Sequence, residues 1–407
     1  MRYLFTIAMM WCCAQMSAQR HTVYSDDIRS LQVVAGTRWQ ELPIIRLNSG
    51  EGVNISFDEL SHDYHRYTYS VVHLEKDWTE SEALMSSDYV NGFQSDLTID
   101  NYEESINTTQ NYTHYQFRIP NGQCRLRLSG NYRVDVYDND NPNPNDNRVL
   151  SAYFMVSEDI VNVGTGCSGD TDIDVRRNHQ QVTVKLDYSK LKATNPREQI
   201  TGYVLQNYRW DNMVTLPYPT SINQQYMEWS HCRDLIFEGG NEYHKFEILD
   251  IHRNSFHVEN NTWDKENEIW HTWVWPDYRR ATYSYDEVPK GAFILRNSDN
   301  RESATTSEYV MVHFTLLAAE PFPYPVYVDG MWGTHLMTYD TGRKEYICAV
   351  PLKYGYYSYQ YLMKKSDGTT AIPPTEGSFY ETRNKYTVLI YYRGTIDRTD
   401  RLVGVKN

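Results

Sequence analysis

Short stretches in which apolar and polar residues alternate recur along the whole chain, and turn residues separate them. In 66–73, the four residues Tyr67, Tyr69, Val71 and His73 fall on one face. Alternation with a period of two is typical of a β-strand with one buried face, whereas a helical period is nearly absent from this chain. We therefore predict an all-β protein made of β-sandwiches, and no nucleotide-binding or helical fold.

The amino-acid composition supports this fold class and limits the partners. The chain contains 35 Tyr, 10 Trp and 12 Phe, and such bulky side chains pack well across neighbouring strands. Its formal net charge is −14, which repels phosphate backbones, so we expect no nucleic-acid binding. No segment after the N-terminus offers about 18 consecutive apolar residues, so we expect no membrane-spanning helix in the mature protein.

The N-terminus has the pattern of a secretory signal peptide. Arg2 supplies a positive charge, an apolar core runs from Tyr3 to Cys13, and small residues follow near Ala18. We predict that residues 1–19 are a cleaved signal peptide, with an uncleaved anchor as the alternative. The four cysteines outside it are scattered singly without a CxxC pair, so a zinc cluster has no support and their pairing stays open: Cys124, Cys167, Cys232 and Cys348.

Turn-rich stretches divide the chain into three predicted sandwiches. The first spans 20–156 and the second 157–300, while a polar stretch at 298–306 makes a linker to a third sandwich at 308–407, which resembles an early-set domain. We thus predict tandem immunoglobulin-like or early-set sandwiches. The predicted strands are Leu31–Ala35, Gly52–Asp58, Arg66–Leu74, Asn111–Ile119, Asn131–Tyr137, Arg148–Val156, Gln181–Leu186, Gln199–Gln206, Lys245–Ile251, Gly291–Leu295 and Tyr309–Leu316. The third sandwich finishes near Tyr386–Tyr392.

No catalytic motif is present, so we predict that the protein is not an enzyme and needs no cofactor. There is no nucleophile elbow, zinc-protease motif or phosphate-binding loop. Two Asp-rich segments raise a calcium question, since clustered oxygen ligands suit that ion. The loop from Asp138 to Asn147 fails the EF-hand pattern, and Asp170, Asp172 and Asp174 alternate as on one face of a strand. Solvated loops and protected strand edges explain the two segments better than calcium does, and calcium binding stays open as the alternative.

A tryptophan cluster offers a second kind of site. Its members are Trp263, Trp270, Trp273 and Trp275. Trp rings pack in cores, anchor protein interfaces or stack on sugars, and the sequence leaves these three roles open.

Several blocks, taken in order, resemble a Bacteroidetes family, the plug proteins of the type IX secretion system. The longest block runs from Thr113-His114-Tyr115 through 129–132, Ser-Gly-Asn-Tyr, to Tyr137, and by spacing alone it suggests a β-hairpin. The others lie at Asp77-Trp78, 88–93, 101–109, 206–212 and 237–246. Departures are mild: Asn91 replaces an Asp, and Tyr243-His244 replaces Phe-Arg.

The resemblance implies a function that composition cannot give. Members of such a family are non-catalytic periplasmic proteins that bind a very large outer-membrane β-barrel, the translocon, and occlude its periplasmic opening. We expect two blocks with specified loops to touch this partner, with structural turns as the alternative. Their candidate residues are Arg209, Trp210, Asp211, Asn212, Gly239, Gly240, Asn241 and Glu242.

Two other functions stay open at this stage. The first is a glycan-binding protein of the cell envelope that uses the tryptophan cluster and the third sandwich. The second is a small outer-membrane barrel, which is disfavoured by polar residues on both strand faces and by a C-terminus, Val405 to Asn407, without a terminal aromatic residue.

Overall fold

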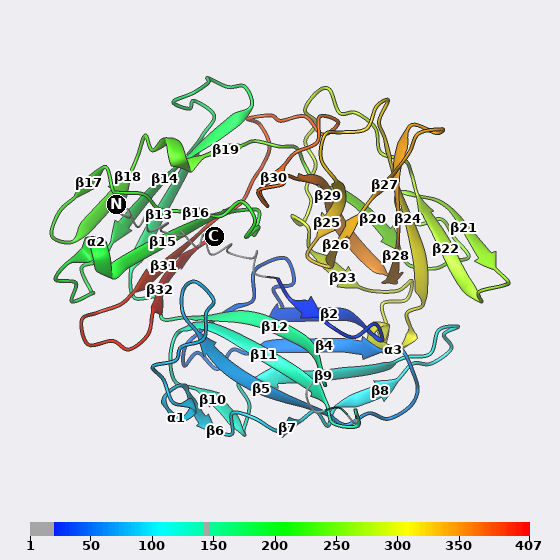
Figure 1. Ribbon diagram of the computed structural model, residues 1–407, viewed down its shortest axis with the longest axis horizontal. Helices are drawn as coiled ribbons and strands as arrows, with labels where there is room; N and C mark the ends of the chain where they lie inside the picture. Colours follow the sequence, from blue (N-terminus) through cyan, green and yellow to red (C-terminus); the bar gives the residue numbers. More distant parts are fainter. Residues whose placement is uncertain (1–19, 142, 144–146) are drawn as a thin grey trace, which may run out of the picture.

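The structure, a computed structural model, describes residues 20–141, 143 and 147–407, and the predicted signal peptide lies outside these residues. The described chain is nearly all β, as predicted, and its sheets pack in pairs into three sandwiches (Figure 1). In the view of Figure 1 the first sandwich lies at the bottom, the second at the left and the third at the right.

The first sandwich pairs a large sheet with a smaller one and adds a short two-stranded sheet. The large sheet contains β1 (Thr22–Val23), β3 (Ile44–Arg46), β5 (Tyr67–Leu74), β7 (Leu97–Thr98), β11 (Gly130–Asp138) and β12 (Arg148–Ser157). Facing it are β2 (Ile28–Ala35), β4 (Val53–Glu59), β8 (Tyr102–Glu104) and β9 (Thr113–Ile119), while β6 (Val90–Gly92) pairs with β10 (Cys124–Leu126). Tyr67, Tyr69, Val71 and His73 are all buried, as their alternation predicted.

The second sandwich takes its strands from two separate parts of the chain. One sheet contains β13 (Asn162–Ser168), β14 (His179–Asp187), β17 (Ser221–Ile222), β18 (Tyr226–Trp229) and β19 (Ile236–Glu238). The other contains β15 (Ile200–Gln206), β16 (Val214–Thr215), β31 (Tyr386–Tyr392) and β32 (Arg401–Lys406). In Figure 1 the red C-terminal strands accordingly lie beside the green ones.

The third sandwich is an insertion between these two parts. Its first sheet contains β20 (His244–Ile248), β23 (Phe293–Leu295), β25 (Val326–Gly330), β26 (Gly333–Leu336), β29 (Gly355–Lys364) and β30 (Thr370–Ala371). Its second sheet contains β21 (Val258–Asp264), β22 (Ile269–Val274), β24 (Tyr309–Leu317), β27 (Thr338–Asp340) and β28 (Glu345–Lys353). Residues from β20 to β30 therefore share one hydrophobic core.

The sheets do not follow the boundaries that the sequence suggested near residues 300 and 308. β20 to β23 belong to the third sandwich, and β31 and β32 return to the second, where β31 pairs with β15 along its whole length. The polar stretch 298–306 connects β23 to β24 inside the third sandwich and contains the short helix α3 (Ser303–Thr306). The long block also differs from a hairpin, because β9 and β11 lie in opposite sheets.

Helices are few and short. Besides α3, the chain forms α1 (Ser86–Tyr89), α2 (Pro196–Gln199) and the 3-10 turn η1 (Arg233–Leu235). Within the described ranges, no helix has both the length and the apolar character needed to cross a bilayer.

A fourth apolar cluster joins the first sandwich to the second. It places Leu42 and Met155 of the first against Tyr203, Leu205 and Tyr391 of the second, all of them buried. The outer face of the β15–β31 sheet is therefore covered by another sandwich, so the two bodies bury apolar surface against each other.

Candidate functional site at the junction of the three sandwiches

The three sandwiches meet around a cavity rich in aromatic side chains. Its volume is about 490 Å³, within the usual range for a binding pocket. All three sandwiches contribute to its lining, which includes Trp39, Trp78, Tyr208, Trp210, Tyr243 and Trp332. At this cavity, part of the predicted partner-binding set, Arg209 and Trp210, meets residues of the first and third sandwiches.

Segment 209–212 connects all three bodies. The Trp210 ring packs edge-on against Trp78 of the first sandwich, with ring centroids 5.2 Å apart. The Arg209 guanidinium pairs with Asp211 at 2.5 Å and also donates to Thr370 Oγ1 of the third sandwich at 2.9 Å. Asn212 stays within the second sandwich, where its amide donates to Gln206 Oε1 at 3.0 Å.

The ion pair in this segment is nearly buried, since both side chains are 10% exposed. Burial alone would raise the pKa of Asp211, but the Arg209 guanidinium outweighs it and holds that pKa well below its ordinary value. The loop before the pair has positive φ angles at Asn207 (54°) and Tyr208 (64°), which few residues other than glycine adopt. Hydrogen bonds between Asn207 and Lys385 in both directions hold this shape.

Segment 239–242 is the place where the chain leaves the second sandwich for the third. Gly239 has no room for a side chain, because a Cβ atom there would lie 2.1 Å from the carbonyl oxygen of Phe379. The Asn241 amide donates to the Glu376 carbonyl at 2.8 Å, and Thr382 Oγ1 donates to the Gly240 carbonyl at 2.7 Å. The outgoing segment is thus fastened to the returning segment 376–382.

The Glu242 carboxylate is the centre of a buried polar group. Lys290 forms an ion pair with it, and both side chains are at most 4% exposed. Tyr283 donates to it through its hydroxyl at 3.0 Å, and Arg383 through its backbone N–H at 2.9 Å. All eight candidate partner-binding residues therefore have contacts within the chain or lie buried, and their direct contact with a partner stays a prediction.

A second buried network, which the sequence did not reveal, joins the first sandwich to the third. Asp58 of β4 lies 2.7 Å from Lys353 Nζ of β28, and both side chains are fully buried. The same carboxylate lies 2.6 Å from His114 Nδ1 and accepts a hydrogen bond of 2.6 Å from the Tyr309 hydroxyl. Burial alone would raise the pKa of Asp58, but Lys353 and His114 together lower it.

A third network inside the third sandwich has the residue types of a catalytic site. His244 lies between two carboxylates, 2.9 Å from Asp277 and 3.0 Å from Glu376. Burial alone would lower the pKa of His244, but the two carboxylates raise it to about 9. Tyr359 and Tyr361 donate to Asp277 at 2.7 and 2.8 Å, and all these side chains are buried, so the group has the character of a structural salt-bridge network.

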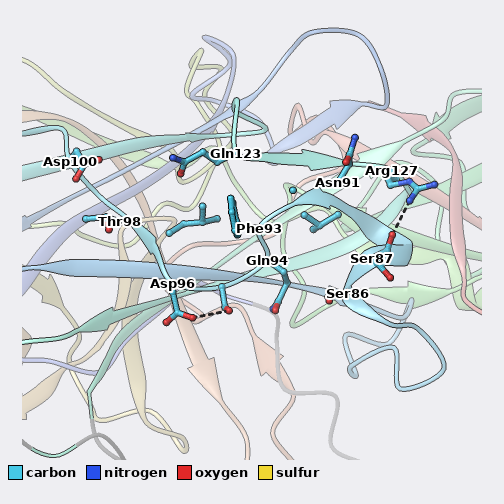
Figure 2. Close-up of a pocket in the computed structure, with 14 residues that line it drawn as sticks. Ser86, Ser87, Asn91, Phe93, Gln94, Asp96, Thr98, Asp100, Gln123 and Arg127 are labelled. Carbon is cyan, nitrogen blue, oxygen red and sulfur yellow. Dashed lines mark hydrogen bonds between the residues drawn. The ribbon is translucent and has the colours of Figure 1, made fainter.

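The block at 88–93 forms an open hollow of about 800 Å³ at the far end of the first sandwich. Figure 2 shows Phe93 in the middle of this hollow, between Gln94 and Gln123. The Phe93 side chain is 67% exposed, and that of the nearby Met85 is 74% exposed. Gly92 allows this placement, since its φ is 116° and a Cβ atom would lie 2.0 Å from the Gln123 carbonyl oxygen. Single exposed apolar side chains are common, but contiguous apolar surface rimmed by polar residues marks binding sites, and Phe93 with Met85 is the candidate for such a surface on this sandwich.

The tryptophan cluster lies on the β21–β22 hairpin, and none of its four members is fully buried. Trp263 and Trp270 contact each other with centroids 5.2 Å apart. Trp273 stacks on His313 at 4.6 Å with the two rings 6° from parallel, and Trp275 is 50% exposed. The cluster therefore combines ring packing with an exposed edge.

The remaining sequence questions concern cysteines and metals. All four described cysteines are free thiols; Cys124 and Cys232 are buried, Cys348 is partly exposed and Cys167 is exposed. The segment from Asp170 to Asp174 is a turn and not a strand, because β13 ends at Ser168. Across the part of the chain that the structure describes, no three His, Cys, Asp or Glu side chains are grouped to hold a metal ion.

Comparisons with known proteins match the first sandwich to a protein family and the whole fold to a solved structure. The family described as "Type 9 secretion system plug protein 1st domain" matches residues 28–158, the first sandwich. The chain is also similar to a crystal structure of a hypothetical protein from Parabacteroides merdae ATCC 43184. The two share 38% sequence identity with a TM-score of 0.90, over 95% of this chain and 98% of that one. No curated protein matches the chain.

Proposed function

We propose that this chain, a member of the type IX secretion system plug protein family, is a periplasmic plug that binds and occludes the periplasmic opening of the outer-membrane translocon. The family itself points to a cell-envelope location, an association with the secretion system and a role without catalysis. The match over residues 28–158 is the observation that carries the proposal.

The surface features of the matched sandwich fit such a role. Phe93 and Met85 expose apolar surface at its far end, and a partner that covers them gains the free energy of burying that surface. We therefore place one contact with the barrel at the hollow drawn in Figure 2. Segments 209–212 and 239–242 support binding indirectly in this arrangement. Trp210 packs the second sandwich against the first, and segment 239–242 fastens the crossing between the second and third sandwiches.

Capture of the partner tests the binding half of the proposal. The tagged chain is purified from its native bacterium in mild detergent, and the co-purifying proteins are identified. We expect a very large outer-membrane barrel protein, and we expect Phe93→Asp to reduce its recovery. Phe256→Asp is the matched control, since Phe256 is a 54% exposed Phe on the third sandwich. If the wild-type chain recovers no such barrel, the proposal is wrong.

The occluding half needs a measurement on cells. An unplugged translocon is a wide aqueous channel, so a strain that lacks this protein should admit solutes that the outer membrane normally excludes. We expect the deletion strain to become sensitive to a glycopeptide antibiotic, and the wild-type gene to restore resistance. Unchanged sensitivity would contradict occlusion and leave binding as a separate question.

One observation favours glycan binding as a second candidate function. Trp275 is 50% exposed and Tyr278 is 69% exposed, both next to the ring stack of the third sandwich. Exposed aromatic rings can stack on sugars, so retention on immobilised starch or peptidoglycan, lost in Trp275→Ala, would support this function in place of the plug.

A further inference from the structure

The second sandwich has one sheet edge that is open and unprotected. β13 ends the sheet β13-β14-β18-β17 and pairs with β14 at every residue from Asn162 to Ser168. No described strand pairs with its other side, and the described loops form no backbone hydrogen bond with it. All its residues except Val163 are exposed. Alternate N–H and C=O groups along this edge are therefore free to pair with another chain.

Several of the other described sheet edges carry features by which proteins prevent such pairing, or are too short to offer much of an edge. β7, β16 and β17 are two residues long, and β8 is three residues long with two glutamates. β2 and β21 are longer, but each is interrupted by a register shift. β32 begins with Arg401, and its outer side accepts hydrogen bonds from the segment that leads into β13. β13 has seven residues, with no charge, no proline and no register shift, which is the combination that favours strand addition.

The surroundings of this edge fit a single extended chain. A pocket of about 360 Å³ lies along β13 and is lined by Thr165, Gly166 and Cys167. Glu41 of the first sandwich and Asn407 at the C-terminus line the same pocket. Because Glu41 and Asn407 lie beside the edge, a second folded sandwich would clash with them. A single added strand needs only the usual distance between neighbouring strands, about 4.8 Å.

The two glycines of β13 indicate which side chains the added strand would carry. Gly164 and Gly166 lie on the same face of the strand, since they are two residues apart. A Cβ atom on Gly166 would meet nothing within 4 Å, and one on Gly164 would meet only Lys185 at van der Waals distance. Large aromatic or β-branched side chains on a neighbouring strand can cover such glycines and gain contact area.

We propose that β13 is the receptor edge for one extended segment of the translocon, which adds to the sheet with a bulky side chain over Gly164 and Gly166. This inference rests on the proposed function. It gives the translocon a second contact, at β13, besides the one at the Phe93 hollow. Backbone pairing supplies most of the recognition, so the segment is identified by its extended shape and bulky apolar side chain.

The experiment uses the tagged full chain and the barrel captured from its native bacterium. Thr165→Lys places a charge in the middle of the edge, and Thr262→Lys is the matched control, an exposed threonine within the seven-residue edge strand β21. We expect Thr165→Lys to lower recovery of the barrel about tenfold and Thr262→Lys to leave it unchanged. Hydrogen exchange of residues 162–168 should slow in the captured wild-type complex relative to the free chain.

The outcomes separate this inference from the function on which it rests. If the wild type recovers the barrel, but Thr165→Lys recovers it equally and exchange at 162–168 is unchanged, the inference is overturned and the plug function stands. If the wild type recovers no barrel, both are overturned. If exchange at 162–168 is already slow in the purified chain and light scattering shows a dimer, a second copy occupies the edge and the inference is also overturned. A thermal melt like the wild type's shows that Thr165→Lys is folded, and Gly166→Lys repeats the test if it is not.

Discussion

Removal of Lys353 tests whether the buried network between the first and third sandwiches stabilises the fold. Lys353 Nζ lies 2.7 Å from Asp58 Oδ2, donates to the Ala304 carbonyl at 2.5 Å and lies 3.9 Å from the Tyr112 ring centroid. Lys353→Met keeps the unbranched side chain up to the ε position but removes the charged Nζ. Asp58 would then remain buried, with contacts only to His114 and Tyr309.

The cost follows from the burial of both partners. Breaking a fully buried ion pair by removing one partner costs about 3–5 kcal/mol, because the other charge is left uncompensated. Since the contacts of Asp58 with His114 and Tyr309 remain, we expect the lower end, about 3 kcal/mol. Asp58→Asn in the same chain removes the remaining charge. The double variant should then lose about 2 kcal/mol less than the sum of the two single variants.

Urea unfolding at pH 7 measures these differences, and hydrogen exchange of β9 and β24 reports whether the first and third sandwiches separate before they unfold. Lys185→Met is the control, because its ion pair with Glu228 has an N–O distance of 3.5 Å and Lys185 is 54% exposed. It should change stability by less than about 1 kcal/mol. A loss of less than about 1 kcal/mol for Lys353→Met, or strict additivity in the double variant, would refute the reasoning.

Three further predictions concern other parts of the structure. His244 has a pKa raised to about 9 from 6.5, so the folded state binds more protons between these values and stability should fall as pH rises through this window. His244→Gln should flatten that slope, which pH-dependent urea melts would detect; an unchanged slope contradicts the assignment. Gly239→Ala should destabilise by about 2 kcal/mol or more by calorimetry, whereas Gly166→Ala, which meets nothing within 4 Å, should be close to neutral. Trp210→Ala should loosen the first sandwich from the second, seen as faster exchange around Trp78 without loss of either core; equal exchange would show that the ring contact is dispensable.

The strands were predictable where alternation is strong, and their pairing was not. The predicted strand Arg148–Val156 lies within β12, which runs from Arg148 to Ser157, and Asn111–Ile119 overlaps β9 at Thr113–Ile119. Local periodicity reports burial of one face but carries no information about which sheet a strand joins. The return of β31 to the second sandwich depends on the open edge of β15, far away in sequence. The strand β13 was not predicted from the sequence, because it contains two glycines and its residues alternate little between apolar and polar.

The sequence indicated that the candidate segments are loops with a constrained backbone, but not which residues they contact. The two glycines at 239 and 240 indicated a constrained turn, and the structure explains Gly239 by its approach to Phe379. Nothing in the sequence could show that Glu242 pairs with Lys290, or that His114 contacts Asp58, because such pairs join residues about 50 positions apart. A charged residue in a motif therefore does not reveal from the sequence whether it forms a buried ion pair, because its partner is not known.

The path of the chain gives a physical reason why such a molecule suits an occluding role. A sandwich on a single linker can rotate freely, and pressure against a channel opening would displace it. Here the third sandwich is connected by two chain crossings, and these are fastened to each other by Asn241 to Glu376 and Thr382 to Gly240. The first sandwich contacts both of the others. Its Trp78 packs against Trp210 of the second, and its Asp58 pairs with Lys353 of the third. Each pair of sandwiches is therefore in direct contact, so rotation of any one of them breaks buried contacts with the other two.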